Sequence, residues 1–311
     1  MMRNAKCDVA IVGGGIAGLS AAIEAASSGA NVACFEGGMP GGLVANVGRL
    51  DDFPAAADMA GATLATSMLD RATGLGVSFV QGAVTELVPD QSAMTLRTAL
   101  GEFEASATII ATGGRLRHIG VPGEKEFEGR GVSQCDWCDG SLFRDKSVVV
   151  VGGGDSALQA ALHLAQLCRA ITIVARSPRL RAHQAYVMQA ADNERIEFAW
   201  ETVVDAIVGG QVVEKVRLRN LTDGQTEERA CSGVFIFAGV EPCSEFLPDT
   251  INRDKSGRVV VDSDYRTSIP NVYAVGAVRA GYRGRLVNAL GEGAHAAVTV
   301  METLRANGVI M

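Results

Sequence analysis

Two cysteines separated by two residues are the feature of this sequence with the clearest chemical potential. The stretch QCDWCDG contains Cys135, Trp137, Cys138 and Asp139. A Cys-x-x-Cys pair can form half of a zinc site, a structural disulfide, or a pair of thiols that cycles between oxidised and reduced states. The spacing alone does not choose among these three, so the surrounding sequence has to decide.

The composition is that of an ordinary globular protein. Of the 311 residues, 48% are hydrophobic and 20% are charged, and this length suggests two domains with separate cores. The net charge of −7 argues against a nucleic-acid-binding surface. No apolar run approaches the ~20 residues that a membrane span needs, and the N-terminal apolar run is too short for a signal peptide. We expect a cytoplasmic protein that binds neither nucleic acids nor membranes.

An internal repeat organises the chain. Residues 8–37 read DVAIVGGGIAGLSAAIEAASSGANVACFEG, and residues 147–176 read SVVVVGGGDSALQAALHLAQLCRAITIVAR. The two copies align without a gap at a constant offset of 139 residues. Each contains a β-branched run, a glycine cluster, a helical stretch of small and apolar residues, and a second β-rich run. This pattern predicts two βαβ units with right-handed crossovers.

The glycine cluster of each copy is typical of a turn that binds a diphosphate. Its first glycine allows a tight turn after the strand, its third lets the backbone approach a pyrophosphate, and a small residue further on lets the helix pack near the strand. These positions are Gly13, Gly15 and Gly18 in the first copy and Gly152, Gly154 and Ala157 in the second. The free amides and the dipole at the helix N-terminus favour negative charge. We therefore predict two dinucleotide sites.

The copies differ where the ribose of each dinucleotide would bind. The second strand of the first copy ends at Glu36, which can accept hydrogen bonds from ribose hydroxyls. The matching residue of the second copy is Ala175, and polar or basic residues follow it: Arg176, Ser177, Arg179 and Arg181. Arginines offer charge-assisted bonds to a 2′-phosphate. The first copy therefore suits FAD and the second suits NADP.

Short motifs along the whole chain carry a family resemblance. They are GGGIAG at 13–18, PGG at 40–42, ATGG at 111–114, GVPGE at 120–124, GRGVSQCDWCDG at 129–140, GGGDSA at 152–157 and GEGAHAA at 291–297. With these motifs the chain resembles the low-molecular-weight thioredoxin reductases. The cysteine pair lies just ahead of the second glycine fingerprint, whereas the glutathione-reductase branch carries a wider-spaced pair near the N-terminus.

The repeat and the resemblance together predict an α/β fold with two Rossmann-like domains. Each is a three-layer (ββα/βαβ) dinucleotide-binding domain, and the second is inserted in the first. Residues 1–115 and 246–311 are expected to form a discontinuous FAD-binding domain. Residues 116–245 are expected to form the NAD(P)H-binding domain that carries the Cys-x-x-Cys pair.

The resemblance implies that the cysteine pair is redox-active. Electrons would pass from NADPH through FAD and the Cys135/Cys138 pair to a thioredoxin-like protein or another disulfide substrate, in a homodimeric enzyme. Cys138 would face the flavin, Cys135 would exchange with the partner's disulfide, and Asp139 would manage the protons. A zinc site would need a second ligand pair, which the sequence lacks, and a purely structural disulfide is not expected in a reducing compartment.

Matching the family's motifs residue by residue assigns two sets of cofactor-binding positions, and no metal is expected. The positions for FAD are Gly13, Gly15, Ile16, Ala17, Gly18, Glu36, Gly37, Gly42, Gly113, Gly276, Ala277, Arg285 and Leu286. The positions for NADPH are Gly152, Gly154, Asp155, Ser156, Ala157, Arg176, Ser177 and Arg181.

The chain departs from the family pattern at several of these positions. Ser177 removes one of three arginines at the NADP site, and Ala277 replaces an aspartate that binds the flavin. Arg285 stands where the family commonly has glutamine. Trp137 is bulkier than the usual small residue between the cysteines, and its size would affect which disulfide can approach.

These departures leave alternative functions open at the level of sequence. The flavin and cysteines could work with ferredoxin as the electron donor. They could also run in reverse, as an oxidase of a small-molecule dithiol. The loss of the aspartate at position 277 also allows a non-catalytic scaffold that has lost its flavin.

Overall fold

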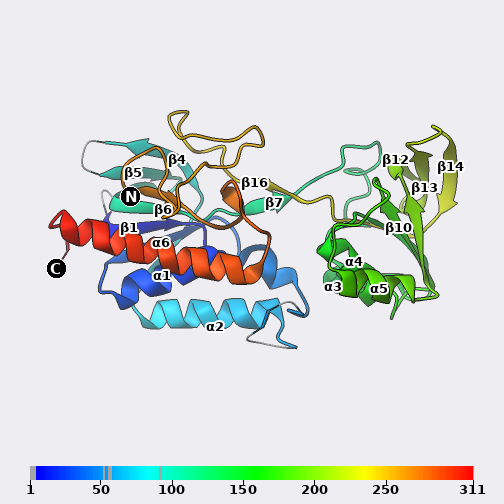
Figure 1. The fold of residues 1–311 in the computed structure, drawn as a ribbon, viewed down its shortest axis with the longest axis horizontal. Coiled ribbons are helices and arrows are strands. Elements are labelled where there is room, and N and C mark those ends of the chain that lie inside the picture. The colour runs from blue at the N-terminus through cyan, green and yellow to red at the C-terminus, as the bar shows by residue number, and fades with distance from the viewer. Residues whose placement is uncertain (1–4, 52, 55–57, 91–92, 311) are drawn as a thin grey trace. The chain divides into compact units, whose positions relative to one another are not determined.

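The computed structural model describes residues 5–51, 53–54, 58–90 and 93–310. The chain forms two compact units, one made of residues 1–115 and 241–311 and the other of residues 116–240 (Figure 1). We call these unit 1 and unit 2. Strands β7 (Gly114–Leu116) and β16 (Val240–Pro242) pair with each other where the chain passes between the units. The second crossing thus falls at 240–241, whereas the sequence placed it at 245–246.

Unit 1 is built on a seven-stranded sheet with the order β3-β2-β1-β6-β5-β4, in which β17 also pairs with β6. The strands are β1 (Ala5–Val12), β2 (Val32–Glu36), β3 (Ser78–Gln81), β4 (Val84–Pro89), β5 (Met94–Thr98), β6 (Gly101–Ile110) and β17 (Val272–Ala274). The pairs among β1, β2, β3, β6 and β17 are parallel, so their carboxyl ends share one edge. β4 and β5 are joined to β6 by antiparallel pairs.

Helices cover one face of the parallel strands. The antiparallel strands β4 and β5, which continue the same sheet from β6, form a β-meander over the other face. The helices are α1 (Ile16–Ser27), α2 (Gly61–Gly74) and α6 (Leu286–Ala306), and β4 and β5 lie on the opposite side (Figure 1). Side chains alternate along a strand, so Val9 and Ile11 of β1 pack among the helices while Ala10 and Val12 pack toward the meander. Two short 3₁₀ helices, Gly42–Asn46 and Gly276–Val278, follow loops at the carboxyl edge.

Unit 2 repeats this three-layer plan on a five-stranded parallel sheet, with the order β11-β10-β9-β15-β8. The strands are β8 (Val132–Ser133), β9 (Ser147–Val151), β10 (Ala170–Ala175), β11 (Ile196–Trp200) and β15 (Gly233–Ile236). Helices α4 (Asp155–Leu164) and α5 (Gln184–Ala191) cover one face, with the short α3 (Asp136–Asp139) and a 3₁₀ helix, Gly140–Phe143, beside α4.

The other face of unit 2 carries an antiparallel meander of β12 (Thr202–Gly209), β13 (Val213–Asn220) and β14 (Thr226–Ala230). Val148 and Val150 of β9 face the helices, and Val149 faces the meander, as the matching residues of β1 do in unit 1. The α/β class and the paired three-layer units predicted from the repeat and the family resemblance are confirmed. Within the part of the chain that the structure describes, no helix is long and apolar enough to cross a membrane.

The contact between α1 and α6 depends on a glycine. A Cβ atom added at Gly293 of α6 would lie 2.2 Å from the backbone oxygen of Ala17 in α1. A Cβ atom added at Gly291, one half-turn earlier in the same helix, would meet no atom within 4 Å. The two glycines therefore form a matched pair, in which only Gly293 is required by close packing.

We predict that Gly293→Ala and Gly291→Ala change stability in opposite directions. Gly293→Ala should lower the free energy of unfolding of unit 1 by about 1–3 kcal/mol, because the added methyl group forces α6 away from α1. Gly291→Ala should raise it by about 0.5–1 kcal/mol, because alanine restricts the unfolded chain and favours the helix. Urea denaturation followed by circular dichroism measures both, and equal effects of the two substitutions would contradict this account of the packing.

Candidate active site

The first glycine turn, between β1 and α1, has the shape that a diphosphate needs. Gly13 has φ +107°, and a Cβ atom there would lie 2.5 Å from the backbone oxygen of Ala111. A Cβ atom at Gly18 would lie 1.9 Å from the oxygen of Gly13, so strand, turn and helix are packed backbone to backbone. Gly15 is the N-cap of α1, and a Cβ atom there would meet nothing within 4 Å. Open space therefore adjoins the free amides of the helix N-terminus.

Glu36 lies at the end of β2, beside this turn. One carboxylate oxygen accepts a hydrogen bond from the amide of Gly14 at 2.7 Å, and the other accepts one from the amide of Gly38 at 2.7 Å. Each carboxylate oxygen has two lone pairs, so both can accept a further bond. The carboxylate is thus fixed in orientation and can still receive ribose hydroxyls.

The loop around the PGG motif lies directly against the first glycine turn. The amide of Gly41 donates to the oxygen of Gly14 at 2.8 Å. A Cβ atom at Gly42 would lie 3.3 Å from the Cα atom of Gly15. The predicted position Gly42 therefore adjoins Gly15, as a shared dinucleotide site requires.

The Gly276–Ala277 turn at the end of β17 is held by a buried ion pair that sequence reasoning missed. The Glu292 side chain is 4% exposed, and one of its oxygens accepts hydrogen bonds from the Gly276 amide at 2.8 Å and from Arg279 Nε at 2.9 Å. The hydrogen bonds that Arg279 donates to Glu292 raise the pKa of Arg279 further above its usual value. The only signal in the sequence was a carboxylate among small residues in GEGAHAA.

The other residues assigned to FAD are also in unit 1. Gly113, at φ +64°, follows β6, and Gly276, at φ +73°, packs near Ala17 of α1. The start of α6 contacts α1, where Ser20 Oγ donates to the oxygen of Leu290 at 2.8 Å. The remaining assigned residues occupy the first turn of α1, the end of β2 and the start of α6: Ile16, Ala17, Gly37, Arg285 and Leu286.

The second glycine turn, between β9 and α4, repeats the geometry of the first. Gly152 has φ +145°, and a Cβ atom there would lie 2.6 Å from the oxygen of Phe237 and 2.9 Å from the Cβ atom of Ala157. Gly154 is the N-cap of α4 and, like Gly15, would have nothing within 4 Å of an added Cβ atom. A diphosphate fits this turn for the same reason.

The segment after β10 is tied to the second turn. The amide of Arg181 donates to the oxygen of Gly153 at 2.7 Å. Asp155 accepts the amide of His183 at 2.7 Å and lies 3.0 Å from Nδ1 of the same histidine. The exposed residues of this region include the predicted Ser156, Arg176, Ser177 and Arg181. The structure therefore brings the predicted NADP residues together at one edge of the unit 2 sheet.

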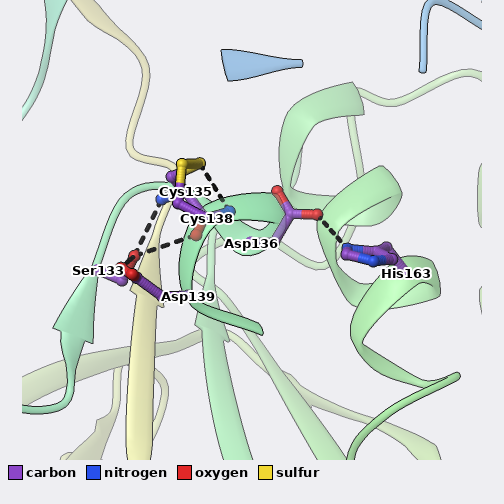
Figure 2. The surroundings of a disulfide bond; sticks show 6 residues. All are labelled: Ser133, Cys135, Asp136, Cys138, Asp139 and His163. Carbon is purple, nitrogen blue, oxygen red and sulfur yellow. Dashed lines mark hydrogen bonds and ion pairs between the residues drawn. A yellow bond between two sulfur atoms is a disulfide. The ribbon is translucent and has the colours of Figure 1, made fainter. Parts of the chain in front are cut away.

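Cys135 and Cys138 form a disulfide, with their Cα atoms 5.3 Å apart (Figure 2). Cys135 is the N-cap of α3, and its Sγ accepts a hydrogen bond from the amide of Cys138 at 3.1 Å. Such an amide favours a thiolate on Cys135 when the pair is reduced. Since β8 runs parallel to the other strands of the five-stranded sheet, the pair lies at the same sheet edge as the second glycine turn.

The side chains around the disulfide fix the loop on both sides (Figure 2). Ser133 Oγ donates to Asp139 Oδ2 at 2.7 Å and accepts the amide of Cys135 at 3.0 Å. On the other side, Asp136 Oδ2 lies 2.8 Å from Nδ1 of His163 in α4. The predicted Asp139 is thus within one helical turn of both cysteines. Ser133, Asp136 and His163 were not anticipated, and His163 lies 27 residues from its partner in the chain.

The other five cysteines form no disulfide, and burial raises the pKa values of their thiols. Burial raises the pKa of Cys7, Cys34 and Cys231 to about 12 and that of Cys168 to about 11. Burial also raises the pKa of Cys243. A raised thiol pKa leaves little thiolate at neutral pH, so these five side chains are poor nucleophiles. Among the described residues, no group of three or more His, Cys, Asp or Glu side chains is arranged to hold a metal ion.

Known proteins that match this chain belong to one family of disulfide-reducing enzymes. The family model described as pyridine nucleotide-disulphide oxidoreductase matches residues 7–297. The thioredoxin reductase of Treponema pallidum is 37% identical over 302 residues, covering 96% of this chain and 98% of that protein. The thioredoxin reductase of Bacillus subtilis is 34% identical, covering 94% of this chain and 93% of that protein.

A solved structure shares the fold as well as the sequence. The thioredoxin reductase of Lactococcus lactis superimposes with a TM-score of 0.94 at 35% sequence identity, covering 96% of this chain and 99% of that one. The family model's range, residues 7–297, spans both units and includes the two glycine turns and the cysteine pair. The chain therefore belongs to the pyridine nucleotide-disulphide oxidoreductase family and, within it, to the thioredoxin reductases.

Proposed function

We propose that this enzyme uses NADPH to reduce the disulfide of a thioredoxin-like protein, with FAD and the Cys135/Cys138 pair between donor and acceptor. The observation that carries the proposal is the Cys135–Cys138 disulfide at the N-terminus of α3, in a unit that also contains a diphosphate-binding turn. The overall reaction transfers two electrons: NADPH, a proton and an oxidised partner give NADP⁺ and a partner with two thiols.

The residues present fit both cofactors. The open N-terminus of α1 and the oriented Glu36 carboxylate suit the diphosphate and ribose of FAD. The N-terminus of α4, with Arg176 and Arg181 nearby, suits the diphosphate and 2′-phosphate of NADPH. Bound FAD would supply a two-electron relay between the nicotinamide and the disulfide. Ala277 offers no carboxylate to the flavin, while Glu292 holds the neighbouring turn in place.

The exchange with the partner is assigned to the two sulfur atoms. In the reduced enzyme the Cys135 thiolate, supported by the Cys138 amide, attacks one sulfur of the partner's disulfide. The partner's S–S bond breaks, and its other sulfur leaves as a thiolate and takes up a proton. Cys138 then loses its proton and attacks Cys135, which restores the enzyme disulfide. The partner's second sulfur leaves in turn and is protonated.

Asp139 is assigned to the proton transfers of this exchange. Its carboxylate is held by the hydroxyl of Ser133, which also accepts the Cys135 amide. The same serine therefore fixes the carboxylate relative to the backbone of the cysteine loop. Asp139 would accept a proton from a thiol and return it to the departing sulfur of the partner.

We also assign the enzyme to the cytoplasm and expect it to act as a homodimer. Outside the redox pair, the cysteines of the described residues are free thiols, which suits a reducing compartment. The resemblance to the low-molecular-weight thioredoxin reductases supports the dimer. Size-exclusion chromatography with light scattering tests it.

The visible spectrum under anaerobic conditions tests the proposed function. We predict visible flavin absorbance that bleaches on addition of NADPH and much less on addition of an equal amount of NADH. Cys135→Ser and Cys138→Ser should each still bleach but should lose at least a hundredfold in kcat for oxidised thioredoxin. A flavoprotein that did not bleach with NADPH would point to another donor such as ferredoxin. Absence of flavin after reconstitution would point to a non-catalytic scaffold.

Glu36→Gln should weaken FAD binding about tenfold. Both carboxylate oxygens of Glu36 accept backbone amides, and the NH₂ group of glutamine cannot replace either acceptor. Asp70→Asn, which removes an exposed carboxylate on α2 of the same unit, serves as the matched control. Fluorescence titration of the apoprotein with FAD gives the dissociation constants, and equal values for the two variants would rule out this role of Glu36.

Alkylation with iodoacetamide at pH 7 should distinguish the redox pair from the other cysteines. Because burial raises their pKa values, Cys7, Cys34, Cys168 and Cys231 stay protonated at this pH and should not react. The oxidised enzyme should therefore gain no rapid label, and the NADPH-reduced enzyme should gain two, at Cys135 and Cys138. Peptide mass spectrometry locates the labels. Cys243 is half-buried, so a Cys243→Ser variant shows whether any of the label comes from that thiol. Fast labelling of the oxidised enzyme would show that another thiol is activated.

A further inference from the structure

Trp137, between the two redox cysteines, is stacked on a histidine of α4. The rings of Trp137 and His163 lie 3.9 Å apart between centroids, with an angle of 9° between their planes. The same imidazole lies 2.8 Å from the carboxylate of Asp136, the residue before Trp137. Two consecutive residues of the redox loop are thus tied to one side chain of a neighbouring helix.

The three side chains differ in exposure. Asp136 and His163 are 13% and 17% exposed, whereas Trp137 is 50% exposed. One face of the indole is therefore covered by the imidazole, and a large part of its surface remains open to solvent beside the disulfide. A single exposed tryptophan is common on protein surfaces, so what distinguishes Trp137 is its place beside the disulfide.

The chemistry of thiol–disulfide exchange determines which part of a partner protein contacts the exposed indole. A mixed disulfide places a partner sulfur about 2 Å from an enzyme sulfur, so the residues that flank the partner's cysteines must contact those that flank Cys135 and Cys138. Trp137 immediately precedes Cys138 and is the large apolar side chain at that place. Tryptophan is among the residue types that contribute most to protein–protein binding energy.

The stack on His163 also determines how much Trp137 can contribute to the free energy of binding a protein partner. A free indole loses rotamer entropy when a partner immobilises it, and this loss reduces the affinity. An indole already stacked on a fixed imidazole has lost most of that freedom before the partner arrives. The Asp136 carboxylate holds the imidazole in turn, because its contact with Nδ1 fixes the orientation of the ring.

We propose that Trp137 is a specificity-determining contact for the disulfide-bearing protein partner and that His163, itself held by Asp136, is a positioning residue that presents the indole to that partner. This inference rests on the proposed function, with oxidised thioredoxin as the occupant. It adds to that function a site for the partner's apolar surface around its disulfide, built by Trp137 of α3 and His163 of α4. Figure 2 shows His163 with Asp136, the side chain that holds its ring.

The test compares a protein disulfide with a small one. Trp137→Ala should raise the KM for oxidised thioredoxin about tenfold while kcat stays within twofold, because the contact serves binding and leaves the sulfur chemistry unchanged. The kcat/KM for bis(2-hydroxyethyl) disulfide, whose short hydroxyethyl arms offer no apolar surface to the indole, should stay within twofold. His163→Ala should raise the KM for thioredoxin at least threefold, and His163→Phe, which keeps a flat ring under the indole but loses the contact with Asp136, should raise it clearly less.

Trp200 provides the matched control, because it is the second tryptophan of the chain and has a similar environment. It is 39% exposed and stacks on Phe198 with centroids 4.9 Å apart and an interplanar angle of 11°, at the end of β11. Trp200→Ala should leave the KM for thioredoxin unchanged. In a Trp200→Phe background, the fluorescence anisotropy of Trp137 should fall in His163→Ala and persist in His163→Phe.

Several results would overturn the inference while the proposed function stands. They are an unchanged KM for thioredoxin in Trp137→Ala, an equal loss toward the small disulfide, a His163→Phe variant as impaired as His163→Ala, or an anisotropy that does not respond to His163→Ala. If wild-type enzyme with NADPH reduced the small disulfide but not thioredoxin, the proposed function would fail, and this inference would fail with it.

Discussion

The close contact between a parallel strand and the helix that follows it is the constraint on which both units depend. In unit 1 the oxygen of Gly13 lies where a side chain at Gly18 would have to be, and in unit 2 Ala157 packs against the turn at Gly152. This contact brings the helix N-terminus to the carboxyl edge of the sheet, where its amides face open space at Gly15 and Gly154. A larger residue at the packed positions would move the helix away and separate those amides from the turn.

The redox pair also lies where the free amides of a helix N-terminus are available, in this case those of the short helix α3. Cys135 takes the N-cap position of α3, so the amide of Cys138 points at its sulfur. A helix of four residues has little stability of its own, because nucleation costs more than so few hydrogen bonds return. The loop is ordered instead by Ser133 with Asp139 on one side and by His163 with Asp136 on the other. Ser133, Asp136 and His163, to which no chemical step is assigned, therefore hold the cysteine loop in place.

The turn after β17 shows how the chain accommodates a departure from its family. Ala277 cannot contribute a carboxylate, yet the Gly276–Val278 turn is well defined, because the buried Glu292 accepts the Gly276 amide and pairs with Arg279. A buried carboxylate without partners would be costly, and here its oxygens are engaged by the guanidinium and by the backbone. Removing either partner would leave the other charge buried and uncompensated.

The sequence alone specified the two dinucleotide turns, through the repeat and its glycines, and the spacing of the cysteine pair; together with the family resemblance it also specified the fold class. These features are local: strand alternation has a period of two, as Val9 and Ala10 show by facing opposite layers, and each glycine turn is encoded within about ten residues. Only the tertiary structure decided which distant side chains complete the sites. The pairing of Asp136 with His163, the stack of His163 on Trp137 and the contact of Glu292 with Gly276 join separate elements. No periodic pattern records such contacts, because they depend on how helices pack on the sheet and not on the spacing of residues along the chain.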